Sequence, residues 1–452
     1  MSECGVCSSS SPSIRAPGSN REEGSMRRKD TKKETSQMDK MERRAFLGIL
    51  AGGMGGLVTR QFFWPADRIL YAQSPGDKTL VILNLAGGND AMNMVPPLGL
   101  PDYYKNRPTL AIPAKAAISL LQGPKGTKEH GLHPSLKQLG TFWNQGELAI
   151  VRKVGYPKAN GSHFTSARIW SRGYREDPAS QEDSGWIARF LDRYGKGLVP
   201  VVGIGTGRRL DFRGGSKRSL IVERIGDFGF DGDSSYRGRS RYRNQLLAQI
   251  FGKKGSPGTD QLLRETGRKV FGNLSRLEAA AKNYKSTVSY PNSSLAGRLR
   301  EIAVLMKAGI FPQIAYTMHG GFDTHSAQAG RHNSLFTTLD EALAAFRQDL
   351  IAMGAWKRTV IVLISEFGRR NYENGSKGTD HGQASFVLAL GGAVNGGLHG
   401  PRLTPQDLQA PSLPYGVDFR DVYEALLSQH LGVPGDKLFP EPRPLRSKLK
   451  LV

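Results

Sequence analysis

Acidic and imidazole side chains follow apolar runs at several points of the chain, and these residues define the chemistry to be explained. Residues 359–365 form an apolar, β-branched run that Glu366 follows directly. Asp380 and His381 stand shortly before a second apolar run, residues 385–390. Carboxylates and imidazoles so placed are suited to acid–base catalysis or to metal binding. Equally, Glu366 could form a structural ion pair with the arginines that follow it, and Asp380 could shape a turn.

A second acid–imidazole pair, Asp323 and His325, follows the apolar run 313–318. If the segment stays extended, side chains two residues apart point to the same face. A carboxylate and an imidazole on one face could bind a single divalent metal ion. The alternative is that Asp323 orients a structural histidine.

Two further groups complete the candidate chemistry. Asp90 ends a Gly-Gly-Asn-Asp turn after the apolar run 79–86, where it either projects over the sheet edge or caps the next element. Ser162, His163 and Arg168 lie within seven residues of one another and could supply a nucleophile, a ligand and an anion clamp. Ser162 could equally be a helix N-cap and Arg168 a surface charge.

The elements that must position these residues are of two kinds. Continuous apolar runs are typical of strands buried on both faces of a parallel sheet, and longer segments with helical spacing separate them. Strands are predicted at 79–86, 148–154, 201–204, 313–318, 359–365 and 385–390, and helices at 133–143, 185–194, 262–282, 295–308, 335–350 and 419–431. In open α/β sheets, ligands bind beyond the carboxyl ends of the strands, which is where the candidate residues fall.

The N-terminal region indicates export. Residues 1–40 are polar and charged and are predicted to be a disordered extension. Arg43 and Arg44 then precede a Gly-rich apolar segment, residues 46–58, which is too short to cross a hydrocarbon core of about 30 Å. This pattern is typical of a twin-arginine signal over residues 41–72.

Cleavage after Ala72 would release a mature α/β domain, residues 73–452. We therefore expect the twin-arginine translocase as a partner during export, a periplasmic or extracellular location, and no stable transmembrane anchor. Cys4 and Cys7 are the only cysteines, so the mature chain would contain no disulfide.

The formal net charge of +23 favours anionic partners such as phosphate or sulfate esters, acidic polymers or nucleic acid. A Gly- and Arg-rich stretch, residues 206–258, could contact nucleic acid through phosphates and stacking. The stretch is short and carries Asp231 and Asp233, and export argues against such a task. We interpret it as a cationic lid or insertion and expect no nucleic-acid partner.

The motifs together resemble the domain-of-unknown-function family 1501, in that family's order and over residues 43–435. The motifs that carry the resemblance, besides the signal, are residues 87–90, 162–164, 320–325, 365–369, 379–382 and 418–423. That family is similar to the alkaline phosphatase and sulfatase superfamily, whose members hydrolyse or transfer phosphate and sulfate esters. The resemblance implies an alkaline phosphatase-like fold, a three-layer α/β/α sandwich around a mostly parallel sheet.

The resemblance also implies a set of site residues. The metal ligands would be drawn from Asp90, Asp323, His325, Glu366, Asp380 and His381, and the catalytic group would comprise Ser162 as nucleophile with His163, Arg168 and Arg369. Thr165 is a second candidate nucleophile. A divalent ion (zinc, manganese or calcium) is expected.

Two departures from the superfamily favour one metal site over two. Phe367 stands where relatives have a second ligand, and Asp323 and His325 are two rather than four residues apart. A formylglycine sulfatase is excluded, because the mature chain has no cysteine.

Two functions follow from these observations. The first is an exported, metal-dependent hydrolase of phosphate or sulfate esters, whose substrate is an anionic small molecule or polymer. The alternative is a non-catalytic secreted binding protein on a degenerate fold of the same kind, in which the same residues are core ion pairs.

Overall fold

The computed structural model describes most of the chain after residue 77. The described residues are 78–174, 184–217, 219–225, 249–250, 260–261, 264, 284–439, 443 and 446–452. The extension and signal expected at 1–72 lie outside them, as does most of the helix expected at 262–282. All described residues belong to one compact unit, Trp64–Val452. Within it, no described helix is long and apolar enough to cross a membrane.

The centre of this unit is a mixed sheet in which the strand order is β10-β4-β9-β8-β1-β7-β5-β6, with β11 also paired to β4. The strands are β1 (Thr79–Ala86), β4 (Leu148–Gly155), β5 (Val201–Ile204), β6 (Leu220–Val222), β7 (Ile314–Gly320), β8 (Thr359–Ile364), β9 (Ser385–Leu390), β10 (Gly397–His399) and β11 (Val417–Asp418). All neighbours are parallel except β9, which is antiparallel to both β4 and β8. A small antiparallel pair, β2 (Ile118–Ser119) and β3 (Gly131–Leu132), lies apart from the main sheet.

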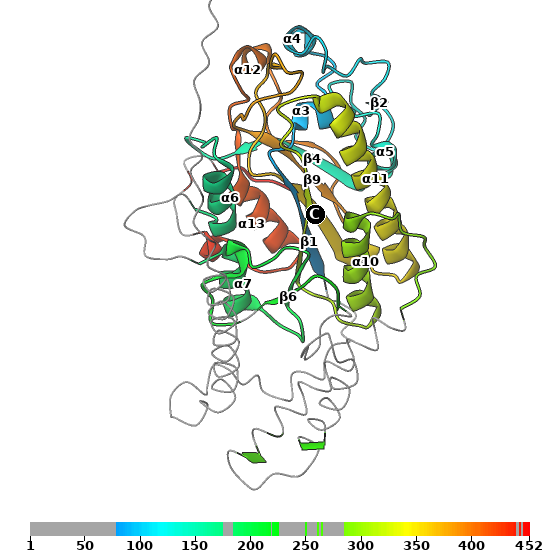
Figure 1. The fold of residues 1–452 in the computed structure, drawn as a ribbon, viewed down its shortest axis with the longest axis vertical. Coiled ribbons are helices and arrows are strands. Elements are labelled where there is room, and N and C mark those ends of the chain that lie inside the picture. The colour runs from blue at the N-terminus through cyan, green and yellow to red at the C-terminus, as the bar shows by residue number, and fades with distance from the viewer. Residues whose placement is uncertain are drawn as a thin grey trace, which may run out of the picture. The chain divides into compact units, whose positions relative to one another are not determined.

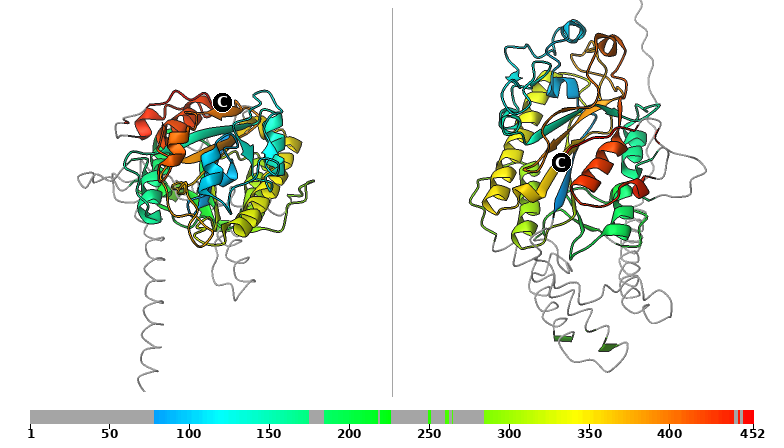
Figure 2. Two further views of the ribbon diagram at one scale, coloured as in Figure 1. Left: turned by 90° about the horizontal axis from the view of Figure 1, so that it is seen from above. Right: turned by 180° about the vertical axis from the view of Figure 1, so that it is seen from behind.

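Both faces of the sheet are covered, as the apolar runs predict. Along β1, Val81 and Leu83 pack into one buried cluster, whereas Leu80 and Ile82 pack into the other. This alternation follows from the two-residue period of a strand. Helices α5 (Lys137–Asn144), α10 (Ser294–Lys307) and α11 (Gln328–Ala352) contribute to the first cluster. Helices α6 (His163–Arg172), α7 (Trp186–Tyr194) and α13 (Phe419–Gln429) contribute to the second, so helices lie on both sides of the sheet (Figure 1 and Figure 2). The predicted three-layer α/β/α sandwich is confirmed.

The helices predicted at 133–143, 185–194, 295–308 and 419–431 correspond to α5, α7, α10 and α13 to within a few residues. The helix predicted at 335–350 corresponds to α11, which extends further at its N-terminus, whereas α3 (Ala91–Met94), α4 (Pro101–Asn106), α6 and α12 (Pro405–Gln409) were not predicted. The chain also forms the short 3₁₀ turns η3 (Leu210–Phe212), η5 (Trp356–Arg358) and η6 (Asp436–Leu438).

The reversed strand β9 has a direct consequence for the site. A parallel neighbour of β8 would require a crossover, usually a helix, whereas residues 365–384 contain no helix and let the chain turn back. This connection is closed by an isolated antiparallel bridge between Arg369 and His381. The loop therefore holds its polar residues over the carboxyl end of β8.

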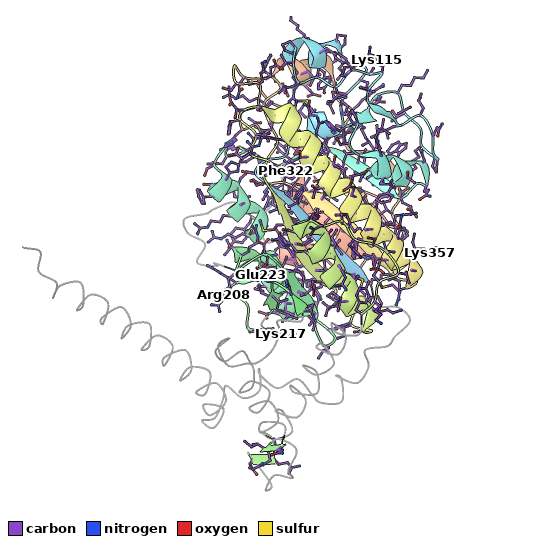
Figure 3. All side chains as sticks on the ribbon, turned by 45° about the vertical axis from the view of Figure 1, so that its right-hand side comes forward. Lys115, Arg208, Lys217, Glu223, Phe322 and Lys357 are labelled. Carbon is purple, nitrogen blue, oxygen red and sulfur yellow. The ribbon has the colours of Figure 1, made fainter. Side chains whose placement is uncertain are left out.

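Part of the basic stretch predicted as an insertion belongs to the sheet. Residues 210–212 form η3, and β6 pairs in parallel with β5 at the edge of the sheet. Arg208, labelled in Figure 3, is exposed beside them. Residues 226–248 of the stretch lie outside the described residues, so the proposed lid remains a prediction.

Candidate metal centre

The candidate centre lies beyond the carboxyl ends of β7 and β8. Asp323 and His325 follow β7, His381 lies in the β8–β9 loop, and His163 begins α6. Beneath Asp323, the buried Phe322 (Figure 3) packs edge-on against His319 and His332 and contacts Phe336. The backbone that carries Asp323 is therefore fixed by the core.

The turn after β1 allows the neighbouring strand ends to come this close. Gly87 and Gly88 have φ values of +116° and +69°, which side chains rarely adopt. A Cβ on Gly87 would lie 2.5 Å from the backbone nitrogen of Asp323, and one on Gly88 would lie 2.3 Å from Cε2 of Phe367. Side chains at these two positions would push apart the segments that carry the site.

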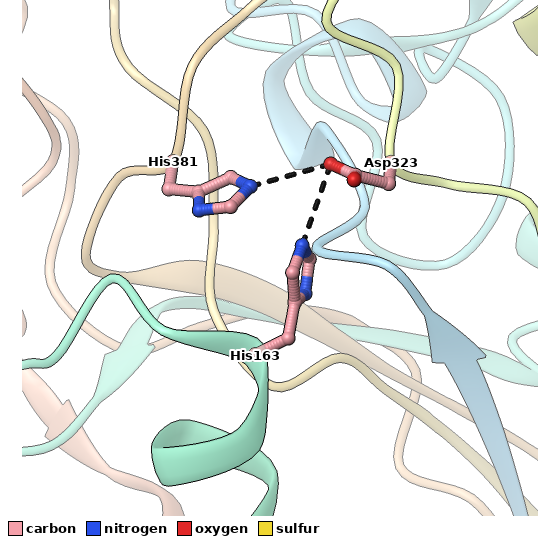
Figure 4. Close-up of side chains that lie close together, drawn as sticks. All are labelled: His163, Asp323 and His381. Atoms are coloured by element: carbon pink, nitrogen blue, oxygen red, sulfur yellow. Dashed lines mark hydrogen bonds and ion pairs between the residues drawn. The ribbon is translucent and has the colours of Figure 1, made fainter.

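Two imidazoles converge on one carboxylate oxygen. Nε2 of His163 lies 3.4 Å from Oδ1 of Asp323, and Nε2 of His381 lies 3.2 Å from the same oxygen (Figure 4). A ligand atom from each of the three residues lies within 4.8 Å of the others. Around a tetrahedral zinc ion with bonds of about 2.0–2.1 Å, neighbouring ligand atoms would be separated by about 3.3 Å. The spacing fits one small divalent ion.

A fourth candidate ligand stands beside these three. Nε2 of His325 lies 3.1 Å from Asp323 Oδ1 and 2.9 Å from Nε2 of His381. Among the described residues, the buried Nε2 of His163 has no hydrogen-bond partner. A buried nitrogen without a partner is costly unless a ligand satisfies it, which is a second sign that these residues fit a metal ion.

Two acids of the β8–β9 loop contact the imidazoles at Nδ1, whereas the Asp323 oxygen lies near Nε2. Oε1 of Glu366 lies 2.8 Å from Nδ1 of His163 and accepts a hydrogen bond from the backbone of Gly87. Oδ1 of Asp380 lies 3.2 Å from Nδ1 of His325. Both residues are thus in the predicted site, but each contacts a histidine rather than the shared Asp323 oxygen.

The groups around Asp323 stabilise its negative charge. Burial acts to raise the pKa of Asp323, but the hydrogen bond from Arg369 and the contact with His381 outweigh it and lower the pKa to about 2. Nη2 of Arg369 donates to Asp323 Oδ1 at 2.6 Å. Asp323 is therefore ionised across the whole physiological range, with its charge partly balanced by Arg369.

The contacts of Arg369 do not favour its predicted catalytic role of binding a substrate anion. Its side chain is fully buried, and its N–H groups also donate to backbone carbonyls on three segments. These acceptors are the carbonyls of Gly87, Gly88, Phe322 and Thr379. Because its N–H groups are hydrogen-bonded to acceptors within the protein, Arg369 is placed to link the strand ends rather than to bind a substrate.

Asp90 lies in a separate buried network. Its Oδ2 accepts hydrogen bonds from Arg107 at 2.5 Å and from Gln328 at 2.6 Å. Burial would raise the pKa of Asp90, yet the ion pair with Arg107 outweighs burial and lowers it. Gln328 in turn accepts from Thr324 and Thr379, so this network supports the backbone on either side of the centre. Asp90 is not among the residues whose ligand atoms converge.

The predicted nucleophile lies next to the cluster in sequence. Ser162 is the N-cap of α6, and its Oγ is 3.5 Å from the backbone nitrogen of Thr165. Ser162 is exposed, and Arg168 is exposed further along the same helix. The N-cap role that sequence left open is observed, while the catalytic roles of Ser162, Thr165 and Arg168 remain predictions.

The structure adds packing partners of the site that the sequence did not indicate. Phe367 is buried, and its ring centroid lies 4.8 Å from that of His163 and 4.6 Å from that of His381. Ser166 donates to the carbonyl of Glu366 and is itself 2.6 Å from the hydroxyl of Tyr156. Buried aromatic and hydroxyl groups carry no distinctive sequence pattern, so such packing partners emerge only from the fold.

Comparison with known proteins supports the resemblance. Residues 291–434 match the model of a family described as protein of unknown function (DUF1501). The matched range includes Asp323, His325, Glu366 and His381, whereas His163 lies before it. No curated protein matches the chain.

Several solved structures align with most of the chain. A protein of the alkaline phosphatase superfamily from Vibrio parahaemolyticus is 12% identical with a TM-score of 0.33, and the alignment covers 79% of this chain and 67% of the other. The C-terminal periplasmic domain of EcEptC from Escherichia coli, in complex with zinc, is 9% identical with a TM-score of 0.36 and coverages of 80% and 84%. The sulfatase PsFucS1 from Pseudoalteromonas sp. is 11% identical with a TM-score of 0.34 and coverages of 82% and 74%. At such low scores, any function of this chain must be inferred from its own residues.

Proposed function

We propose that this protein is an exported, metal-dependent hydrolase of phosphate or sulfate esters. The observation that supports the proposal most strongly is the convergence of His163, His325 and His381 on one oxygen of Asp323. The four side chains come from three distant segments of the chain. Export rests on the twin-arginine pattern at Arg43 and Arg44.

The residues have the donor types and the access that such a centre needs. Imidazole nitrogens and a carboxylate oxygen suit zinc or manganese better than calcium, which prefers oxygen ligands. When bound, such an ion supplies Lewis acidity that stabilises the charge developing on the ester oxygens and promotes ionisation of a nucleophile. The side chains of Asp323 and His325 are 47% and 43% exposed, so an ester in solution can reach the cluster. One metal ion remains the expectation.

Ser162 is proposed as the nucleophile. Its hydroxyl lies at the N-terminus of α6, where the helix dipole favours negative charge, as it would on an ionised serine. The net positive charge of the chain would favour encounter with anionic esters. Arg168, exposed on the same helix, stays a proposed anion-binding residue.

An activity assay tests this proposal. The full chain is loaded with zinc or manganese and assayed on aryl phosphates and aryl sulfates, and Ser162→Ala is compared with Thr165→Ala. We expect turnover that chelation abolishes and that falls at least 100-fold in Ser162→Ala but not in Thr165→Ala. Metal-loaded, folded protein without turnover on either substrate class would contradict the hydrolase.

One observation favours the alternative, a secreted binding protein without catalysis. Arg369 already donates to the Asp323 oxygen at 2.6 Å, and this ion pair balances the carboxylate without a metal. In that case the full chain would bind no zinc or manganese and would still bind an acidic polymer such as heparin in a salt-dependent manner. Metal binding at one ion per chain would exclude this alternative.

A further inference from the structure

The three imidazoles of the centre share one arrangement. Each directs Nε2 toward the Asp323 oxygen and has Nδ1 beside an oxygen atom of a different segment. For His163 this oxygen is Oε1 of Glu366 at 2.8 Å, and for His325 it is Oδ1 of Asp380 at 3.2 Å. For His381 it is the backbone carbonyl of Gly161 at 2.7 Å.

These oxygens determine which ring nitrogen carries the proton. A carbonyl oxygen can only accept, so Nδ1 of His381 must donate to Gly161. Oδ1 of Asp380 already accepts from Asn374, and Oε1 of Glu366 already accepts from Gly87, so both oxygens are placed to accept from Nδ1 of His325 and of His163 as well. In a neutral imidazole the proton on Nδ1 leaves a lone pair on Nε2.

At the other ring nitrogen, this form requires a bound cation, because each Nε2 lies 3.1 to 3.4 Å from the Asp323 oxygen, which can only accept. Arg369, which can only donate, places Nη1 3.5 Å from Nε2 of His325. Two unprotonated nitrogens, those of His325 and His381, then face each other at 2.9 Å. Their lone pairs repel unless a cation lies between them. The arrangement is what a metal ion bound by Nε2 of His163 and His381 would require, with Nε2 of His325 beside it as a further donor.

We infer that Glu366 and Asp380 are positioning residues that fix His163 and His325 in the Nδ1–H form and aim their Nε2 atoms at a shared metal ion, rather than ligands of that ion. This inference rests on the proposed metal centre and revises the ligand set implied by the resemblance. Glu366 is the stronger of the two, because it is buried and the backbone N–H of Gly87 also holds its carboxylate.

The contacts distinguish a positioning acid from a ligand. Glu366 is buried, and its Oε1 is engaged by both His163 and Gly87. Its Oε2 lies 3.3 Å from the Ser365 hydroxyl, which has a closer acceptor in the carbonyl of Leu85 at 2.7 Å. An amide oxygen can still accept the N–H of His163, so Glu366→Gln preserves the positioning hydrogen bond. The same substitution would remove an anionic ligand. Glu366→Ala removes the acceptor altogether.

The test measures zinc affinity by competition with a chromophoric chelator in the full chain. Cys4→Ser and Cys7→Ser are included in every protein, because these thiols could bind zinc themselves. We expect Glu366→Ala and Asp380→Ala to weaken zinc binding about 10- to 100-fold, and Glu366→Gln to weaken it clearly less than Glu366→Ala. Glu341→Gln, an exposed acid on α11, is the matched control and should leave the affinity unchanged.

A spectroscopic measurement reads the proton positions directly. Long-range ¹H–¹⁵N correlation of histidine side chains in the zinc-loaded protein should show His163, His325 and His381 protonated at Nδ1. Because Asp380 lies in a partly exposed loop, its variants provide a second route if Glu366→Ala does not fold.

The outcomes separate this inference from the proposed function. Wild-type protein that binds zinc while Glu366→Gln loses as much affinity as Glu366→Ala would make Glu366 a ligand and overturn the inference alone. Unchanged affinity in folded Glu366→Ala and Asp380→Ala, or protonation of the three rings at Nε2, would do the same. Folded wild-type protein that binds neither zinc nor manganese would overturn the metal centre itself.

Discussion

At the scale of single residues, the centre depends on how closely the turn after β1 approaches its neighbours. Gly88 faces the ring of Phe367, which in turn contacts the imidazoles of His163 and His381. Phe367 cannot bind a metal, yet it fills the space beside two proposed ligands. The packing of this ring therefore sets the angle of both imidazoles.

Gly88→Ala tests this packing. The new methyl group would meet Phe367 at 2.3 Å on a backbone with φ of +69°, so we expect a loss of about 1–3 kcal/mol in the free energy of unfolding. Zinc affinity should fall as well, since Phe367 must shift. Gly99→Ala, where no atom lies within 4 Å, is the control and should change stability by less than about 0.5 kcal/mol. Equal stabilities of the two variants in urea unfolding would contradict the account.

Sequence indicated the chemistry of the site better than the role of each residue. Asp323, His325 and His381 were expected as ligands from their types and their positions after strands, and the fold brings them together. His163 was expected either as a ligand or as part of the catalytic group, and its Nε2 lies close to Asp323 and His381. Residue type does not reveal which of several acids faces the shared centre, because that depends on contacts such as that of Asp90 with Arg107.

At the scale of secondary structure, Arg369 joins the elements that carry the centre. Its donors reach the turn after β1, the segment after β7 and the end of the β8–β9 loop. A lysine keeps the charge but has a single nitrogen, which cannot reach all of these acceptors. The arrangement of three chain segments thus depends on one planar guanidinium group.

We predict that Arg369→Lys lowers the free energy of unfolding by about 2–4 kcal/mol, because buried carbonyl oxygens lose their donors. Denaturant unfolding of the full chain measures the change. Arg370→Lys replaces the neighbouring arginine, which is exposed, and should have little effect. A stability of Arg369→Lys equal to that of Arg370→Lys would mean that the hydrogen bonds of Arg369 do not hold the strand ends together.

The elements themselves were largely predictable. Strands such as β1, β5 and β9 have the predicted bounds, because continuous apolar runs are a strong signal for buried strands. The direction of β9 was not predicted, since an apolar run looks the same in either orientation. The short strands β10 and β11 were also missed, as two or three residues carry too little pattern.

At the scale of the whole molecule, buried histidines make stability depend on pH. Burial lowers the pKa of His332 to about 3, and of His130, His133 and His430 to about 4. In the unfolded chain these groups titrate near about 6.5. Between these values the unfolded state binds more protons than the folded state, so the free energy of unfolding increases with pH. Their contribution is complete above about pH 6.5 and is lost as the pH falls toward 3 to 4.

His332→Gln should reduce this dependence. At pH 5 an unfolded histidine gains about 2 kcal/mol from protonation that buried His332 cannot match, so the stability difference between pH 7.5 and pH 5 should shrink by about that amount. Urea unfolding at the two pH values measures it. Asn333→Ala, on the exposed side of α11, should keep the wild-type difference. If His332→Gln also kept it, His332 would have to be protonated in the folded protein.

The most direct test of the central claim is the zinc stoichiometry of the full chain with Cys4→Ser and Cys7→Ser, measured by elemental analysis after loading and removal of free metal. The account predicts one ion per chain, lost in both Asp323→Ala and His381→Ala while circular dichroism shows that these variants remain folded. A folded wild-type chain that retains neither zinc nor manganese, or variants that retain a full ion, would contradict it.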